Sequence, residues 1–144
     1  MILGQANKLT VVNNALVEFK NVLNEMGVFN DVATTVSSEF GRTLTTNGDG
    51  SDHAWGGNSI VMGGDVNGST TYGSYPSLAA GSPQFLGNRG IMVPTTATDS
   101  FFAELALWYG IDPTDLPTLF PNLGNFHNLG TIATTNPPLG FMNM

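Results

Sequence analysis

Apolar side chains recur every three or four positions over the first 26 residues, a spacing that places them on one face of an α-helix. Gly27 follows at the position where a left-handed residue ends many helices, so we expect a helix over residues 1–26. Because the pattern starts almost at Met1 without a capping residue, we expect the chain to have been cut from a longer protein. The recurring positions are Leu3, Ala6, Leu9, Val12, Leu16, Phe19, Leu23 and Met26.

Two short segments are predicted as strands. Residues 29–38 follow the first helix and are rich in Val, Ala and Thr without a clean alternation. This composition is typical of a strand buried on both faces of a parallel sheet, and a helix followed by a parallel strand is half of a right-handed crossover unit. The second strand is expected over residues 59–62, and the polar, glycine-containing stretch 43–58 between them is expected to be a loop.

The second half of the chain begins with a glycine- and proline-rich excursion over residues 65–89, where a short hairpin is expected near 69–75. A helix is expected from an N-cap at Thr98 to Gly110, and a short helical turn over 115–120. The predicted fold class is α/β, with helices flanking a small, mostly parallel sheet and a long glycine-rich loop excursion. So thin a sheet needs further sequence, or another chain, to complete it.

Composition narrows the classes of partner. The net charge is −7, and Lys and Arg together number only four, so the chain cannot form the basic patch that nucleic acid or anionic lipid requires. The absence of cysteine excludes disulfides and thiolate chemistry. No apolar run approaches the roughly 20 residues of a membrane span, and the chain shows no signal peptide.

The loop after the first predicted strand contains three residues of the types that bind metals: Glu39, Asp52 and His53. Carboxylate oxygen and imidazole nitrogen suit zinc, and also manganese or iron. The glycines between Glu39 and Asp52 allow the loop to fold back onto the strand end. Within a strand, however, Asp52 and His53 would diverge, and ordinary polar loops also collect such residues, so hydrogen-bonding loop residues are the alternative interpretation.

Three other residues each have two interpretations. Arg42 would either clamp an anion beside a metal or pair with Glu39 and orient the strand end. Trp55 would wall a pocket or anchor its loop. His127, isolated near the C-terminus, is interpreted as structural or solvated rather than as a ligand.

Longer stretches of the chain resemble a known family. They are SEFGRT, NGDGSDHAWGG, GGDVNGSTTYGSYPSL, VPTTATDSFFAELALWYG and LFPNLGNF, in this order along nearly the whole chain. They resemble the C-terminal part of an uncharacterised bacterial family, DUF1501, of the alkaline phosphatase and sulfatase superfamily. The resemblance implies a sandwich of helices around a mostly parallel sheet and divalent metals at the strand ends. Glu39, Asp52 and His53 match acidic and histidine positions of the motif.

The resemblance also implies an activity and a location. Members look like hydrolases of phosphate or sulfate esters, so the implied substrate is an anionic small-molecule ester. Many look exported, which implies a periplasmic or extracellular location. The family's N-terminal half, with its first metal-binding acid and its nucleophile, has no counterpart in these 144 residues. We therefore expect one domain over 1–144 that is an incomplete part of a larger one, with weak metal binding and no turnover.

Two function hypotheses follow from the sequence. The first is a metallohydrolase segment in which Glu39, Asp52 and His53 bind a divalent metal and Arg42 holds the ester. The second is a non-enzymatic structural protein that assembles with copies of itself. Low charge, a thin sheet and an exposed sheet edge would favour such assembly.

Overall fold

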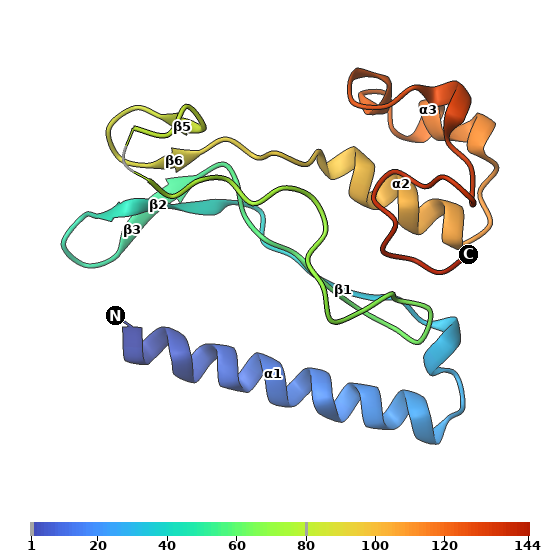
Figure 1. Ribbon diagram of the computed structural model, residues 1–144. Coiled ribbons are helices and arrows are strands. Elements are labelled where there is room, and N and C mark those ends of the chain that lie inside the picture. The colour runs from blue at the N-terminus through green and yellow to red at the C-terminus, as the bar shows by residue number, and fades with distance from the viewer. Residues whose placement is uncertain (1, 80) are drawn as a thin grey trace.

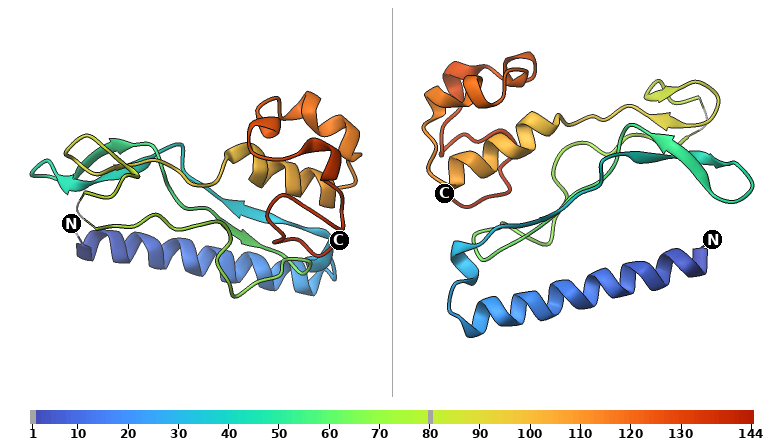
Figure 2. Two further views of the ribbon diagram at one scale, coloured as in Figure 1. Left: turned by 45° about the horizontal axis from the view of Figure 1, so that its top comes forward. Right: turned by 180° about the vertical axis from the view of Figure 1, so that it is seen from behind.

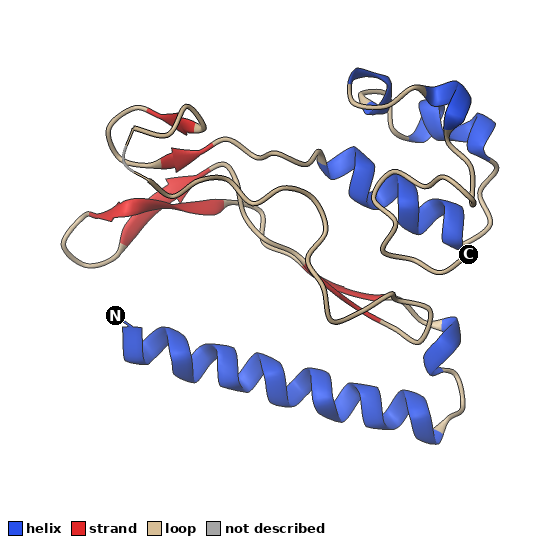
Figure 3. Ribbon diagram, in the orientation of Figure 1, coloured by secondary structure: helices blue, strands red, loops and turns tan. Residues whose placement is uncertain are grey.

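The computed structural model describes residues 2–79 and 81–144, and within them the chain is a mixed α/β protein. Three α-helices and three two-stranded antiparallel sheets make up this part, as Figures 1 and 3 show. The helices are α1 (Ile2–Glu25), α2 (Thr98–Trp108) and α3 (Leu116–Leu119); the single-turn 3-10 helices are η1 (Phe29–Asp31), η2 (Pro113–Asp115), η3 (Leu123–Asn125) and η4 (Leu129–Thr131). The strands are β1 (Thr34–Val36), β2 (Gly41–Thr46), β3 (Ser51–Ala54), β4 (Ile60–Met62), β5 (Phe85–Leu86) and β6 (Ile91–Met92).

The prediction of the first helix is confirmed, since α1 ends before Gly27, which has a φ of 72°. A left-handed residue at this position turns the chain towards η1. Near this end Leu23 is buried, and the ammonium of Lys20 lies 5.5 Å from the centre of the Phe29 ring. The rest of the helix runs along one side of the molecule (Figure 2), and between residues 4 and 25 its other side chains are exposed, except Leu16, which is half-buried.

The strands of the described residues pair antiparallel, which corrects the prediction of a mostly parallel sheet. β1 pairs with β4 in the register Thr34↔Met62 and Val36↔Ile60. A parallel pair needs a crossover connection of a dozen or more residues, usually a helix. The connection between β1 and β4 contains no helix but a second hairpin, so the chain returns in the opposite direction.

That second hairpin, β2–β3, lies inside the segment predicted as a loop. Its turn is closed by a hydrogen bond from the Asn47 amide to the Gly50 carbonyl, and Gly48 has a φ of 106°. The β5–β6 hairpin lies against it, because Leu44 and Thr45 of β2 donate backbone hydrogen bonds to Gly90 and Arg89, at 3.2 Å each. The prediction of a hairpin near 69–75 is wrong, because the hairpin in the second half of the chain is formed by β5 and β6.

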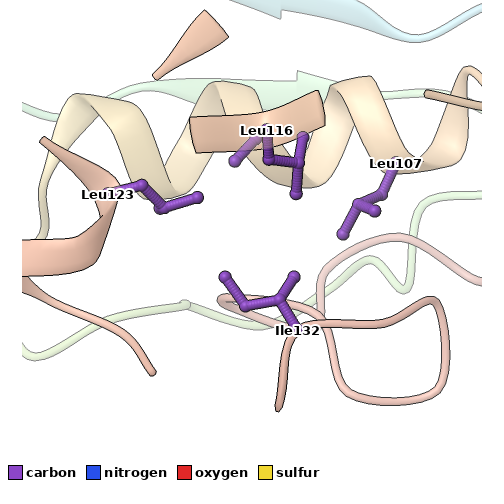
Figure 4. Packing of buried hydrophobic residues seen from close by; sticks show 5 residues of the cluster. Leu107, Leu116, Leu123 and Ile132 are labelled. Carbon is purple, nitrogen blue, oxygen red and sulfur yellow. The ribbon is translucent and has the colours of Figure 1, made fainter. Parts of the chain in front are cut away.

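The hydrophobic core lies at the other end of the molecule, between α2, α3 and the turns that follow (Figures 1 and 4). The helix from Thr98 and the short helix near 115–120 are both confirmed. Gly110, with a φ of 98°, ends the first of them and lets the chain double back over it. The buried cluster consists of Ala103, Leu107, Leu116, Leu123 and Ile132.

A buried carboxylate fastens the end of the chain to this core. Glu104 of α2 is 0% exposed and accepts backbone N–H groups from Leu139, Gly140 and Met142, at 2.6, 2.7 and 2.8 Å. A charge buried without a cation is costly unless hydrogen bonds satisfy it, and these three donors surround both oxygens. The segment 139–142 is therefore part of the interior.

Candidate functional site

The four residues singled out from the sequence all lie on or beside the β2–β3 hairpin. Arg42 belongs to β2, Asp52 and His53 belong to β3, and Glu39 precedes β2 by two positions. Arg42 and His53 are directly opposite in the strand register. Residues opposite each other in an antiparallel pair project from the same face, so the hairpin brings these two together.

On this face, the ring of Phe40 stacks on the imidazole of His53, with 3.7 Å between ring centres and 22° between planes. The guanidinium carbon of Arg42 lies 5.4 Å from the centre of the Phe40 ring. Arg42 also donates a 2.7 Å hydrogen bond from Nη1 to the carbonyl of Ser51. The three side chains form an ordered cluster, and the His53 and Arg42 groups at its edge remain exposed.

Asp52 is directed to the other face of the hairpin. One carboxylate oxygen accepts a 2.7 Å hydrogen bond from the side-chain amide of Asn47, and the other pairs with the guanidinium of Arg89 from the β5–β6 turn. The hydrogen bond from Asn47, with the charge of Arg89, lowers the pKa of Asp52 below its ordinary value despite some loss of hydration. The Asp52 carboxylate is therefore already occupied by partners from its own chain.

The Glu39 carboxylate is exposed and makes no hydrogen bond or ion pair with any other described residue. Arg42 donates to Ser51 instead, so the ion pair considered for Arg42 and Glu39 is not formed in this structure. Glu39 lines a cleft of about 1080 Å³, which is also lined by Trp55 and by residues at the start of α2. Trp55 is 63% exposed and lines this cleft, which favours its interpretation as the wall of a pocket over its interpretation as a loop anchor.

A complete metal centre is not assembled in the part of the chain that the structure describes. No group of three or more His, Asp or Glu side chains gathers there closely enough to hold an ion. The physical reason is the alternation of a strand, because neighbouring residues such as Asp52 and His53 point to opposite faces. The donor types fit zinc, but of the three candidate ligands Asp52 is occupied by Asn47 and Arg89 in this conformation, which leaves Glu39 and His53 to bind a metal ion.

Two further polar contacts were not found from the sequence. Arg89 had no assigned role there, and no local pattern relates it to Asp52 across 37 positions. The hydroxyl of Ser100 lies 2.8 Å from Nε2 of His127, and Ser100 is only 2% exposed. Such a buried hydroxyl cannot reach a substrate, so the pair joins α2 to the C-terminal turns, as the structural interpretation of His127 expects.

No helix in residues 2–79 and 81–144 is both long enough and apolar enough to cross a membrane. No curated protein and no solved structure matches the chain. The model of one family, described as "Protein of unknown function (DUF1501)", matches residues 3–117. This match covers most of the 144 residues and includes the whole β2–β3 hairpin. The chain therefore belongs to the DUF1501 family of proteins of unknown function.

Proposed function

We propose that this chain is part of a metal-dependent phosphate- or sulfate-ester hydrolase of the alkaline phosphatase and sulfatase superfamily. The observation that supports the proposal is that the Glu39 and His53 side chains are available to bind a ligand. Both are exposed and free of polar partners among the described residues, and the Phe40 ring next to Glu39 in the chain stacks on His53. An uncommitted carboxylate beside a residue whose ring stacks on an ordered imidazole is a suitable start for a divalent metal site.

We assign a role to each candidate side chain from its position on or beside the hairpin and from its partners. Glu39 and His53 act as the first metal ligands, zinc being favoured over manganese or iron by the donor types. Asp52 becomes a third ligand only if it leaves Arg89 and Asn47. Arg42, on the same face as His53, holds the anionic ester through its planar fork.

Two ligands hold zinc weakly, and structural and catalytic sites use three or four. We therefore propose that further polypeptide supplies the remaining ligands and the nucleophile, and that these elements join it in a helix–sheet sandwich. The short two-stranded sheets support this proposal, since they leave unpaired strand edges. A periplasmic or extracellular location is proposed with it, from the resemblance of the motif alone.

Calorimetric titration with zinc tests the metal site, using variants matched by residue type. His53→Ala and Glu39→Ala should each weaken zinc binding about tenfold or more, because one of two free ligands is lost. His127→Ala and Asp112→Ala remove the same groups far from the hairpin and should leave the affinity unchanged. Equal affinity in His53→Ala and His127→Ala, or no zinc binding by the unaltered chain, would refute the proposal.

A second candidate function, self-assembly, is favoured by the surface of α1. At 100° per residue, the apolar positions from Leu9 to Met26, apart from Val17, form a continuous arc of about 160°. Most of its members are exposed, among them Leu9, Val12 and Phe19. A face this wide is normally buried, and we propose that a second copy of the chain covers it. The arc consists of Leu9, Val11, Val12, Ala15, Leu16, Phe19, Val22, Leu23 and Met26.

Sedimentation over a range of protein concentrations tests this assembly. The unaltered chain should shift from monomer to a larger species as concentration rises. Val12→Asp places a charge in the arc and should keep the chain monomeric, whereas Asn14→Asp places the same charge on the opposite face and should not. A strict monomer at all concentrations, or equal behaviour of the two variants, rules out assembly through α1.

A further inference from the structure

The cleft that Glu39 lines is a candidate binding site in its own right. It has a volume of about 1080 Å³ and is bounded by the stretches 37–40, 55–61, 66–76 and 92–98, by the start of α2 and by the segment near Phe141. Small-molecule sites typically occupy about 300–1000 Å³, so this cleft has room for an extended ligand of several linked rings.

Part of the cleft is built from packed and hydrogen-bonded groups. Phe141, which is buried, stacks on Phe101 with 5.3 Å between ring centres and meets the edge of Tyr72 at 6.0 Å. The hydroxyl of Tyr72 donates a 2.6 Å hydrogen bond to the carbonyl of Asn67. The hydroxyl of Thr95 donates to the carbonyl of Ser74, which ties the segment before α2 to the excursion 66–76. These contacts order the walls before any ligand arrives.

The charge of the lining restricts the ligand. Glu39 is the only Asp, Glu, Lys, Arg or His among the described residues that line the cleft, in a chain of net charge −7. Nucleotides and other phosphate-bearing ligands require cationic or metal partners, and none of the lining residues is basic. A polycationic ligand is also disfavoured, because it would have a single carboxylate, Glu39, to pair with among the described lining residues. The ligand is therefore neutral over most of its length.

The neutral lining combines flat aromatic rings with hydroxyl groups. Trp55 and Tyr75 are 63% and 57% exposed, and Phe102 is also exposed. Around them the lining is rich in serine and threonine, whose hydroxyls both donate and accept hydrogen bonds. A lipid tail would leave most of these hydroxyls without partners, at a cost for each. A sugar ring matches both features, because it has C–H faces that pack on aromatic rings and hydroxyls at its rim. The Ser and Thr lining residues are Ser37, Ser38, Ser59, Ser69, Thr70, Thr71, Ser74, Thr95, Thr96 and Thr98.

We propose that this cleft binds a neutral oligosaccharide, with Trp55 and Tyr75 as stacking platforms and Glu39 as an acceptor for sugar hydroxyls. This site requires no metal. It shares Glu39 with the zinc site proposed above, so Glu39 accepts sugar hydroxyls in the metal-free chain, and the stacking on Trp55 and Tyr75 does not depend on the proposed hydrolase. An extended peptide is the main competitor for a cleft of this length. The aromatic rings and the many hydroxyls favour the sugar.

Titration calorimetry in the presence of EDTA tests the proposal with the full chain and four neutral hexasaccharides: cellohexaose, maltohexaose, mannohexaose and xylohexaose. EDTA removes metal, so the result is independent of the zinc titration. At least one of the four should bind, and Trp55→Ala and Tyr75→Ala should each weaken that binding about tenfold. Tyr109→Ala is the matched control, since Tyr109 is 81% exposed but does not line the cleft; its affinity should be unchanged.

Circular dichroism confirms that each variant is folded before it is titrated. Trp55→Phe retains a flat ring and should keep most of the affinity that Trp55→Ala loses. Three outcomes would overturn the proposal. They are no binding of any hexasaccharide at millimolar concentration, equal losses in Trp55→Ala and Tyr109→Ala, or binding of an uncharged Ser/Thr-rich hexapeptide with none of the sugars.

Discussion

The region from α2 to the C-terminus and the helix α1 bury their apolar residues very differently. The α2 region encloses Ala103, Leu116 and Leu123 at 0% exposure. In α1, Leu9 and Val11 are 62% and 69% exposed, and Leu23 is the buried exception among the side chains that the structure describes. Both segments have the apolar spacing of amphipathic helices, but only α2 has neighbouring segments folded over it.

The difference shows that spacing makes a helix suitable for burial but does not supply what buries it. α2 obtains its cover from the residues that follow it, because Gly110 and the turns after it return the chain to the helix. α1 is followed by η1 and then by strands that lead away from it (Figure 1). Most of the stability that packing gives to a helix is therefore available to α2 within the chain, and to α1 only near Leu23.

The largest effect should come from the buried carboxylate. Glu104→Ala leaves three backbone N–H groups without an acceptor, and should reduce the free energy of unfolding by about 3–5 kcal/mol. Glu18→Ala removes the same side chain from exposed α1 and should change it by less than about 0.5 kcal/mol. Urea denaturation followed by circular dichroism measures both. Similar losses in the two variants would contradict the assignment of Glu104 as the anchor of the tail.

A matched pair of leucines tests the core directly. Leu116→Ala creates a cavity beside Leu107 and Leu123 and should reduce the free energy of unfolding by about 3 kcal/mol. Leu9→Ala should reduce it by less than about 0.5 kcal/mol, because that side chain is mostly exposed. Thermal melts at low protein concentration, where α1 is not covered by another copy, make the comparison. If Leu9→Ala is as harmful as Leu116→Ala, then α1 is buried in solution.

The α2 region and α1 can also be compared by removing a hydroxyl group from each, with smaller expected changes in stability. Ser100→Ala removes the partner of His127 inside the α2 region and should reduce the free energy of unfolding by about 1 kcal/mol. Thr10 donates to the carbonyl of Ala6 on the exposed surface of α1, so Thr10→Ala should have an effect within about 0.5 kcal/mol. Hydrogen exchange measures the effect of Ser100→Ala, which should speed exchange at the α2 amides and leave exchange in α1 unchanged.

The smallest effect concerns two exposed carboxylates in different regions. The pKa of Asp52 is lowered first by the amide of Asn47, and that of Asp112 by the hydroxyl and amide of Thr114. A lowered pKa in the folded state favours folding above the ordinary value of 3.8, and this contribution is lost as pH falls through the folded pKa. By NMR titration, Asn47→Ala should raise the pKa of Asp52 and leave that of Asp112 unchanged. A rise in both, or in neither, would show that the hydrogen bond is not the cause.

Local signals in the sequence predicted the helices well. The apolar spacing and Gly27 gave the bounds of α1 to within a residue or two, and Gly110 gave the end of α2. The N-cap was one position off, because Ala97 occupies it without a side-chain hydrogen bond. These features depend on neighbours within one or two turns, which a sequence displays directly.

Strand pairing was harder to predict because it depends on contacts between distant residues. Residues 34–36 do form a strand, but its partner and direction are fixed by the return of β4 after an intervening hairpin. The Asn47–Gly48 pair was the available signal for that hairpin, and the polar composition around it obscured it. The four candidate residues lie on or beside this hairpin, although the segment was predicted as a loop. The divergence of Asp52 from His53 was expected if the segment formed a strand, but the contact with Arg89 required the pairing to be known.

The hydrogen bonds that hold Glu104 have a consequence for how the protein responds to proteolysis. A cut just before Leu139 would separate from α2 all three groups that hold the carboxylate. Cleavage at this point is thus equivalent to damage at the centre of the fold. A shortened product should therefore be cleared rather than persist as a stable remnant.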